Sequence, residues 1–477
     1  MLPVTTVGEM RAIDEAAHRE GRLAELVARA GWEVARRAVA MMGGTYGRRV
    51  VVVAGKGNNG ADGRVAAALL ADRGARVRVV DAVEPPESIS GYDLVVDAAY
   101  GTGFRGDYRA PRTEGEVLAV DIPSGVDGDT GAACDGAVVA RSTVTFAAYK
   151  PGLLFGAGAD LSGEVVLADI GLDVSRASTW VLEGSDVVVP WRGRAAHKWS
   201  MSVSVVAGSP GMMGAARLCS MAAMRAGAGM VRLGVPGATS SDLPLSEVVA
   251  RSLPEAGWET DVVAELGRCR VLAIGSGLGR NAGTSDSVRH LVAASPVPAV
   301  VDADGIVAFG SPAELASAVA SAPGREVVIT PHDGEFTRLT GAPPGEDRLG
   351  ACRKLAGESG AVVLLKGPTT VVAHPDGRAF LVVAGTPVLA TAGSGDVLTG
   401  MIAAFIARGL DPFRAAGFAA QVHGEAGRCG RSEGLVAGDL LDLVPECLEK
   451  RLEQRTQDSA PSRNPGVPAS PGGGADA

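Results

Sequence analysis

The stretch from Ala390 to Gly400 contains the residue types that phosphate chemistry requires. Small residues lead to Asp396, and an apolar run of helical character begins at Val397. Glycines let a backbone approach a ligand closely, and the unpaired N–H groups at a helix N-terminus favour an anion, most often a phosphate. A carboxylate beside a bound phosphate repels it, so Asp396 should have a further task. It could take the proton from a hydroxyl that attacks the phosphate, although an N-cap aspartate after a flexible turn is the simpler alternative.

A second group of polar residues follows three apolar runs in the first half of the chain. The runs at 50–54, 94–96 and 117–120 have the length and composition of strands that are buried on both faces of a parallel sheet. The carboxyl ends of such strands lie along one edge, so the loops after them should meet in space. Each aspartate alone would be a turn former, but three of them after buried strands favour a site. The polar residues of these loops are Asn58, Asn59, Asp62, Asp97, Asp107, Asp121 and Ser124.

The elements that must position these residues alternate between strand and helix along the whole chain. Helical periodicity runs from residue 9 to 42, and the glycine-rich loop 55–63 is expected to precede a helix at 64–73. In the second half, buried strands that end in glycine or polar loops are predicted at 203–207, 271–274, 299–301, 327–329 and 362–365. This alternation predicts α/β domains, each with a mostly parallel sheet and a site at the carboxyl edge.

The composition of the 477-residue chain agrees with α/β layers and argues against several other classes. Glycine is abundant at 66 residues and aromatic residues are scarce at 4%, which does not suit a coiled coil or a disordered chain. The net charge of −9 argues against non-specific binding to nucleic acid. No secretory signal and no run of about 18 apolar residues is present, so we expect a cytoplasmic protein without a membrane span.

The six cysteines are dispersed, with no CxxC pair and no histidine at metal-ligand spacing. We therefore expect them to be small buried hydrophobic residues in a reducing compartment. They are Cys134, Cys219, Cys269, Cys352, Cys429 and Cys447.

Residues 8–175 resemble the NAD(P)H-hydrate epimerase domain, which implies a Rossmann-like fold. The resemblance depends on the segments Asn58–Asp62, Asp97–Gly103 and Asp121–Gly125, with Ala61 in place of the usual glycine. It implies a potassium ion held by Asn59, Asp97 and Ser124, whose oxygens suit a hard cation. It also implies that the hydrated nicotinamide nucleotide is lined by Asn58, Asn59, Gly60, Ala61, Asp62, Gly101, Thr102, Gly103, Phe104, Arg105, Gly106, Asp107 and Asp121.

Asp121 is the predicted general acid/base of this first site. It stands at the end of a buried strand, where it could act on the carbon that carries the hydroxyl. Lys150 could approach the same site, but a solvated loop lysine is the preferred interpretation.

Residues 197–450 resemble the ribokinase-like NAD(P)H-hydrate dehydratases. The segments that carry the resemblance are Gly208–Ala215, Gly275–Gly279, Thr330–Glu335, Lys366–Thr370 and Gly393–Asp396, with Ala392 in place of a usual glycine. The resemblance implies ADP-dependent dehydration of the S-form of hydrated NADH or NADPH, which yields the reduced cofactor, AMP and phosphate, with Mg²⁺ bridging the phosphates. The nucleotide would bind at Lys366, Gly367, Pro368, Thr369, Thr370 and Gly395, and the hydrate at Ala215, Gly277 or Gly279, His332 and the catalytic Asp396.

These observations divide the chain into an epimerase domain (1–190), a dehydratase domain (191–452) and a disordered tail (453–477), because the last segment lacks the apolar residues of a core. Two other interpretations stay open: a small-molecule kinase of the hydroxymethylpyrimidine or sugar type, and a first half that only senses nucleotide or acts as a scaffold. The attached first half argues against a kinase, and its cation set argues against a scaffold. We expect a homo-oligomer of unspecified size. ADP instead of ATP follows from the resemblance alone, and a preference between NADH and NADPH hydrates is left open.

Overall fold

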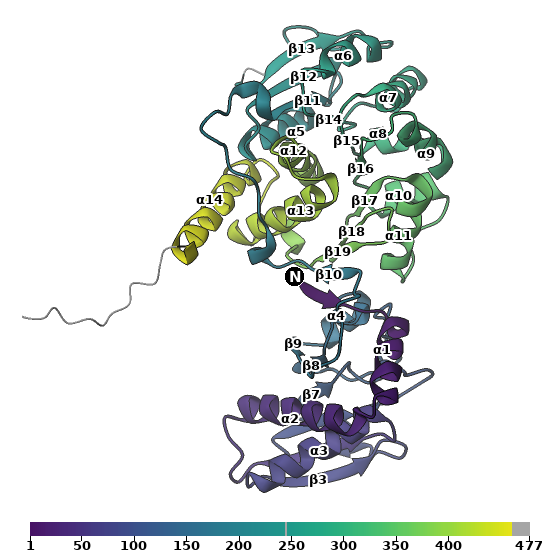
Figure 1. Ribbon diagram of the computed structural model, residues 1–477, viewed down its shortest axis with the longest axis vertical. Helices are drawn as coiled ribbons and strands as arrows, with labels where there is room; N and C mark the ends of the chain where they lie inside the picture. The colour runs from purple at the N-terminus through teal and green to yellow at the C-terminus, as the bar shows by residue number, and fades with distance from the viewer. Residues whose placement is uncertain (244–245, 460–477) are drawn as a thin grey trace, which may run out of the picture.

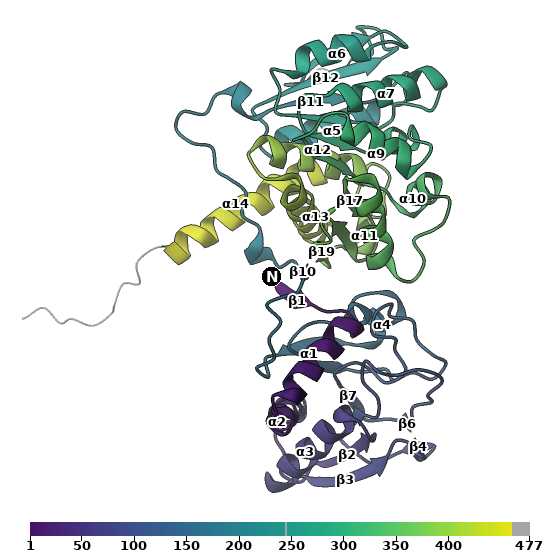
Figure 2. The same cartoon turned by 45° about the vertical axis from the view of Figure 1, so that its right-hand side comes forward.

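The computed structural model describes residues 1–243 and 246–459, which form two lobes joined near the N-terminus (Figure 1). The smaller lobe contains a six-stranded sheet, and the larger lobe contains an eleven-stranded sheet. Strands β1 and β10 lie at the junction, as the turned view also shows (Figure 2). None of the described helices is long and apolar enough to cross a membrane.

The smaller lobe is a doubly wound parallel sheet, as predicted. Its strand order is β3-β2-β5-β7-β8-β9, and all of its pairs are parallel. The strands are β2 (Arg49–Ala54), β3 (Arg76–Asp81), β5 (Leu94–Ala98), β7 (Glu116–Val120), β8 (Ser142–Phe146) and β9 (Glu164–Ala168), with a small pair β4 (Ser88–Ile89) and β6 (Arg112–Thr113) beside them. The helices are α1 (Val7–Arg19), α2 (Leu23–Met42), α3 (Asn58–Asp72) and α4 (Gly156–Leu161), with the 3₁₀ turn η1 (Pro151–Leu153).

The larger sheet has the order β1-β10-β19-β18-β17-β16-β15-β14-β11-β12-β13. It is parallel from β17 to β13, whereas β18 forms antiparallel pairs with β17 and β19. The strands are β1 (Leu2–Val4), β10 (Thr179–Val181), β11 (Ser202–Val206), β12 (Met230–Pro236), β13 (Val249–Leu253), β14 (Val271–Ile274), β15 (Ala299–Val301), β16 (Val327–Ile329), β17 (Val362–Leu365), β18 (Thr370–Ala373) and β19 (Ala379–Val382).

Helices cover both faces of this larger sheet. Neighbouring residues along a strand point to opposite faces, so Val205 packs under one helical layer and Val206 under the other. The first layer contains α5 (Met213–Arg225), α12 (Ser394–Ala407), α13 (Pro412–Cys429) and α14 (Leu440–Ser459). The second contains α6 (Glu259–Leu266), α7 (Ala282–Ala294), α8 (Asp304–Val307), α9 (Pro312–Ala320), α10 (Asp333–Thr340) and α11 (Arg348–Ser359), and the short turns are η2 (Gly184–Asp186), η3 (Lys198–Met201) and η4 (Pro387–Leu389).

Strand pairing joins the two lobes, because two strands from the first half of the chain extend the edge of the larger sheet. β1 is antiparallel to β10, and β10 is parallel to β19 at the edge of the larger sheet. Val4 and Phe155 lie in one hydrophobic cluster with Leu365 and Leu381. The division at residue 190 stays a prediction, but strands that precede it complete the sheet of the second half.

Three expectations from the sequence need correction. Helix α3 begins at Asn58 and not at Arg64, because Gly60 and Gly63 allow the first turns of the helix to pack against Gly55 and Ala98. The proposed tail is helical from residue 453 to Ser459, where α14 continues, and residues 460–477 lie outside the described part of the chain. Not every cysteine is buried: Cys429 is exposed, and its sulfur lies 3.9 Å from that of Cys447.

The packing of α12 on α5 provides a test of the larger core. A Cβ atom at Gly400 would lie 2.1 Å from the carbonyl oxygen of Cys219, whereas one at Gly357 on α11 would meet nothing within 4 Å. We expect Gly400→Ala to lower the free energy of unfolding by about 1–3 kcal/mol through overpacking. Gly357→Ala should raise it by about 0.5–1 kcal/mol, because alanine is the better helix former. Urea titration of both variants measures the difference, and equal effects would contradict this account of the core.

Candidate active sites

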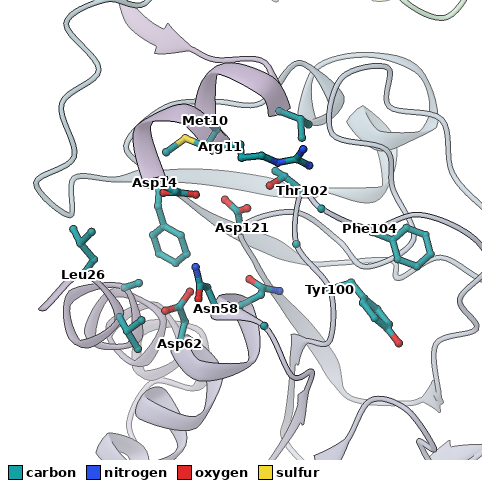
Figure 3. Close-up of a pocket in the computed structure, with 18 of the residues that line it drawn as sticks. Met10, Arg11, Asp14, Leu26, Asn58, Asp62, Tyr100, Thr102, Phe104 and Asp121 are labelled. Atoms are coloured by element: carbon teal, nitrogen blue, oxygen red, sulfur yellow. The ribbon is translucent and has the colours of Figure 1, made fainter. Parts of the chain in front are cut away.

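A cavity of 640 Å³ lies at the carboxyl edge of the smaller sheet. Helices α1 and α2 supply an apolar wall with Met10 and Leu26, and the loops after β2, β5 and β7 supply polar groups (Figure 3). This volume is typical of a small-molecule site. The residues predicted from the sequence that line it are Asn58, Asn59, Asp62, Gly101, Thr102, Gly103, Phe104, Arg105 and Asp121. The structure therefore brings the three predicted loops together.

Four residues that were predicted to line the nucleotide do not line this cavity. They are Gly60, Ala61, Gly106 and Asp107. Gly60 faces the protein interior, since a Cβ atom there would lie 1.9 Å from the carbonyl oxygen of Gly55. It supports the site by letting α3 start close to β2.

Asp121 forms a buried ion pair with Lys150. The Lys150 ammonium lies 2.5 Å from Asp121 Oδ1, and it donates to Thr145 Oγ1 at 3.0 Å and to the carbonyl oxygen of Phe146 at 3.1 Å. Only 1% of the lysine side chain is exposed, so the interpretation of Lys150 as a solvated loop lysine is wrong. Asp121 also has a φ of 68°, a conformation that is strained for a residue with a side chain.

Two further carboxylates face the same cavity, as Figure 3 shows for Asp14 on α1 and Asp62 on α3. Burial raises the pKa of Asp14 to about 6, and the negative charge of Asp121 raises it further. Burial raises the pKa of Asp62 to about 8, again with contributions from Asp121 and then Asp14. The sequence analysis missed Asp14, because it lies in an ordinary amphipathic helix with no polar motif around it.

The residues predicted to hold a cation lie beside the cavity. Asp97 Oδ1 accepts a hydrogen bond from the Ser124 hydroxyl at 2.7 Å, and Asp97 Oδ2 accepts one from the Ser124 N–H at 2.8 Å. Both polar atoms of the Asn59 side chain are buried without a partner among the described residues. Burying an amide without hydrogen bonds is unfavourable, so the unpaired Asn59 oxygen suits a hard cation.

The site of the second half is organised around Lys366 and Asp302. The Lys366 ammonium lies 2.9 Å from Asp302 Oδ1, and Asp302 accepts further bonds from Thr330 Oγ1 at 2.7 Å and Thr399 Oγ1 at 2.8 Å. Although burial opposes ionisation, Lys366 holds the pKa of Asp302 below its usual range. Asp302 directly follows the strand predicted at 299–301, but no pattern in the sequence assigns it a role.

The opening stretch Ala390–Gly400 has the geometry of an anion-binding helix terminus. Gly393 is the N-cap of α12 with a φ of 92°, and Asp396 lies in the first turn of the helix. A Cβ atom at Gly395 would lie 3.2 Å from Lys366 Nζ, so glycine lets this lysine reach the helix N-terminus. Burial raises the pKa of Asp396 to about 6, and the negative charge of Asp302 adds to the effect. Asp396 can therefore accept a proton near neutral pH.

Other predicted residues of the second half surround this terminus. His332 caps α10 by accepting hydrogen bonds at Nδ1 from the N–H groups of Gly334 and Glu335, and Lys366 lies 3.8 Å from Glu335. Lys366–Thr369 form the turn between β17 and β18, and Thr370 begins β18. A Cβ atom at Gly277 would lie 2.8 Å from that of Ala215, so this loop touches the first turn of α5, whereas the Gly279 N–H donates to Asp304 Oδ2.

Two residues that the sequence analysis passed over belong to this region. Arg348 donates to both carboxylate oxygens of Asp333 and to the carbonyl oxygen of Lys366, which joins α10 to the β17–β18 turn. His423 on α13 is buried, and its Nε2 has no partner among the described residues. Burial lowers the pKa of His423 to about 4, so it is neutral near pH 7. A histidine in the middle of an apolar helix gives no sequence pattern that marks it.

Comparison with known proteins identifies a family for each half of the chain. The profile described as NAD(P)H-hydrate dehydratase matches residues 203–448, and the profile of the YjeF-related protein N-terminus matches residues 23–91 and 81–152. The bifunctional NAD(P)H-hydrate repair enzyme Nnr of Moorella thermoacetica is 36% identical over 524 aligned positions, which cover 95% of this chain and 98% of that enzyme. This chain belongs to the bifunctional NAD(P)H-hydrate repair enzymes.

Other relatives support the same assignment and the fold. The bifunctional NAD(P)H-hydrate repair enzyme Nnr of Mycobacterium tuberculosis H37Rv is 40% identical over 415 aligned positions, which cover 80% of this chain and 84% of that enzyme. A ribokinase-like superfamily protein from Enterococcus faecalis has a TM-score of 0.51 at 22% identity, and the match covers 57% of this chain and 96% of that protein. The ribokinase-like fold predicted for the second half is thus confirmed.

The raised pKa of Asp62 predicts a pH-dependent stability. The ordinary value is 3.8, so between pH 3.8 and about 8 the folded protein holds a proton that the unfolded chain has released. The free energy of unfolding therefore falls as pH rises through this interval. Asp14, Asp97 and Asp396 contribute mainly below about pH 6, so the contribution of Asp62 is most distinct between about 6 and about 8.

Asp62→Asn should remove about 1–2 kcal/mol of the loss of stability between pH 6 and 8. Denaturant titration at several pH values measures the slope. Asp93→Asn is the matched control, because hydrogen bonds, first from the Arg49 N–H, lower the pKa of Asp93 and place its titration below this interval. A slope in Asp62→Asn equal to that of the wild type would show that Asp62 is ionised in the folded protein at pH 6.

Proposed function

We propose that this chain repairs hydrated NADH and NADPH with two active sites. The first half interconverts the R- and S-forms of the hydrate, and the second half dehydrates the S-form with ADP, which yields the reduced cofactor, AMP and phosphate. The observation that carries the proposal is the pairing, in one chain of this family, of the Asp121–Lys150 cavity with the helix terminus that presents Asp396. The expected homo-oligomer and the cytoplasmic location stay predictions from the sequence.

Inversion in the first site needs a base and an acid. In the hydrate, the carbon that carries the hydroxyl is also bonded to the ring nitrogen. Asp121, as a carboxylate beside the Lys150 ammonium, takes the hydroxyl proton; the carbon–nitrogen bond then breaks and leaves an aldehyde. Asp62, which keeps a proton near neutral pH, supplies that proton to the nitrogen. Rotation of the aldehyde and attack by the nitrogen on its other face give the opposite epimer, with both protons returned.

A potassium ion fits the residues beside this cavity. Asn59, Asp97 and Ser124 would hold it, since the Asn59 oxygen is buried without a partner and all three side chains offer oxygen ligands. When bound, the ion supplies positive charge that orients the negative phosphates of the substrate.

Dehydration in the second site begins with Asp396. This carboxylate takes the proton of the hydrate's hydroxyl, whose oxygen attacks the terminal phosphorus of ADP, and the bond from that phosphorus to the oxygen of AMP breaks. The N–H groups at the start of α12 and the Lys366 ammonium stabilise the developing negative charge. Phosphate then leaves the hydroxyl-bearing carbon while the neighbouring ring carbon releases a proton to water, which restores the ring double bond.

Mg²⁺ fits this site as an ion carried mainly by the phosphates. The oxygens of Asp302 are engaged by Lys366, Thr330 and Thr399. Within residues 1–243 and 246–459, no group of three His, Cys, Asp or Glu side chains could hold a metal ion. Mg²⁺ often binds through substrate phosphates and water in this way, where it neutralises phosphate charge.

Asp121→Asn should lower the rate of epimer interconversion at least about 100-fold, the usual range for loss of a general base. Chromatography of a single epimer incubated with the variant measures the rate. The control lies in the same molecule: ADP-dependent recovery of NADH from the S-form should stay within about twofold of the wild type. Unchanged interconversion would contradict the role of Asp121.

Asp396→Asn should have the reciprocal effect. Absorbance of the reduced nicotinamide should show dehydration slowed at least about 100-fold, whereas ADP still binds and interconversion of the epimers continues. The wild type should convert a mixture of both epimers completely to NADH when ADP is present. Recovery of only the S-form by the wild type would show that the first half is inactive.

A further inference from the structure

We infer that Thr369, in the proposed nucleotide-binding turn of the second half, is a positioning residue for Lys150 in the epimerase cavity. Binding of ADP to that turn would then slow epimerisation in the first half. This inference depends on the proposed function of both sites. The connection between the two lobes is the turn from Lys150 to Leu154.

Lys150 is followed at once by a tight turn that ends at the second lobe. The Leu153 N–H donates to the carbonyl oxygen of Lys150 at 3.0 Å, and the Leu154 N–H donates to that of Pro151 at 2.8 Å. The carbonyl oxygen of Leu154 then accepts a hydrogen bond from Thr369 Oγ1 at 2.6 Å. The next residue, Phe155, is 4% exposed and lies in the hydrophobic cluster of the larger sheet. No flexible segment separates Lys150 from this contact.

The residue before Lys150 is also held from the junction of the lobes. The Tyr149 N–H donates to the carbonyl oxygen of Pro3 at 2.8 Å, and the Thr5 N–H donates to that of Tyr149 at 2.9 Å. Pro3 belongs to β1, which pairs with β10 at the edge of the larger sheet. The residues before and after Lys150 are therefore both in contact with the larger lobe, through β1 and through Thr369. The Lys150 ammonium itself lies against Asp121 in the smaller lobe.

Gly152 limits how far this turn can move. A Cβ atom there would lie 2.1 Å from the carbonyl oxygen of Asp127, and the Gly152 N–H donates to the carbonyl oxygen of Gly128 at 2.8 Å. Asp127 in turn pairs with Arg105, which lines the cavity. A displacement of the turn at Leu154 would therefore move both Lys150 and the residues that line the cavity.

The Thr369 hydroxyl has one proton and can donate it to one acceptor at a time. In the structure the acceptor is the Leu154 carbonyl oxygen, and the threonine is 8% exposed. The phosphates of ADP are stronger acceptors because they are charged. If the Thr369 hydroxyl donates its hydrogen bond to ADP instead, the Leu154 carbonyl loses its hydrogen-bond donor. The turn that follows Lys150 then loses this contact with the second half. The two sites then compete for one hydrogen bond, and such a coupling is reciprocal.

The test uses the full chain in an Asp396→Asn background, where dehydration does not remove the S-form. The rate at which a single epimer of hydrated NADH converts to the other is measured with and without Mg²⁺ and ADP. We expect ADP to lower this rate about fivefold or more. Adding Thr369→Val should give an equally low kcat without ADP at an unchanged KM, with an altered pH profile, because Lys150 is no longer placed correctly against Asp121. Thr369→Ser should restore the rate.

Ser178→Ala is the control for loss of any contact between the two halves of the chain. It removes a hydroxyl that accepts from Arg353 at 2.9 Å, far along the chain from Lys150, and should leave the rate unchanged. A folded Thr369→Val variant that epimerises at the parent rate without ADP would overturn the inference. So would an unchanged parent rate at an ADP concentration shown by calorimetry to saturate the chain. If the parent does not interconvert the epimers at all, the proposed function of the first half fails instead.

Discussion

A buried charge must keep its partner, and this constraint governs both halves of the molecule: the buried member is Lys150 in the first half and Asp302 in the second. Lys150 and Asp121 join the ends of β8 and β7, and Lys366 and Asp302 join the ends of β17 and β15. Removing one member of such a pair typically destabilises a protein by about 3–5 kcal/mol, because the other charge stays buried and unpaired. The loops around each pair are therefore held to one arrangement. The same rigidity keeps Asp121 and Asp396 in place for proton transfer.

Backbone strain occurs at the same positions. Among the described residues, the non-glycine residues with positive φ are Asp121, Ala147 and Ala303. Asp121 and Ala147 directly follow β7 and β8, and Ala303 follows Asp302 after β15, so each lies in or beside one of the two lysine–aspartate pairs. Such conformations persist only where the surrounding structure fixes them, and they concentrate at functional sites. The strained residues thus mark both sites without reference to any relative.

The sequence predicted the central strands of both sheets, because their apolar runs are short, rich in valine and followed by glycine or polar residues, but it did not predict β8, β10, β18 or β19. It also predicted that Asn58, Asp97 and Asp121 follow strands of one sheet, since parallel strands share a carboxyl edge. It could not predict that Lys150 is buried. That outcome depends on Asp121, a partner 29 residues earlier in the chain, and on the neighbouring lobe, and both are tertiary contacts. Asp14 and His423 were missed for the same reason, because each lies in a helix whose periodicity predicts only packing.

The pairing of β1 with β10, and of β10 with β19, affects how the chain can be made and divided. During synthesis the first half emerges from the ribosome long before β19. Until β19 is made, the edge of β10 that pairs with it has no partner strand. Unpaired strand edges invite association with other chains. Expressing the halves as separate proteins, cut at residue 190, would make this temporary exposure permanent at β10 and β19. The fusion therefore protects the strand edges of both halves, in addition to keeping two repair steps on one polypeptide.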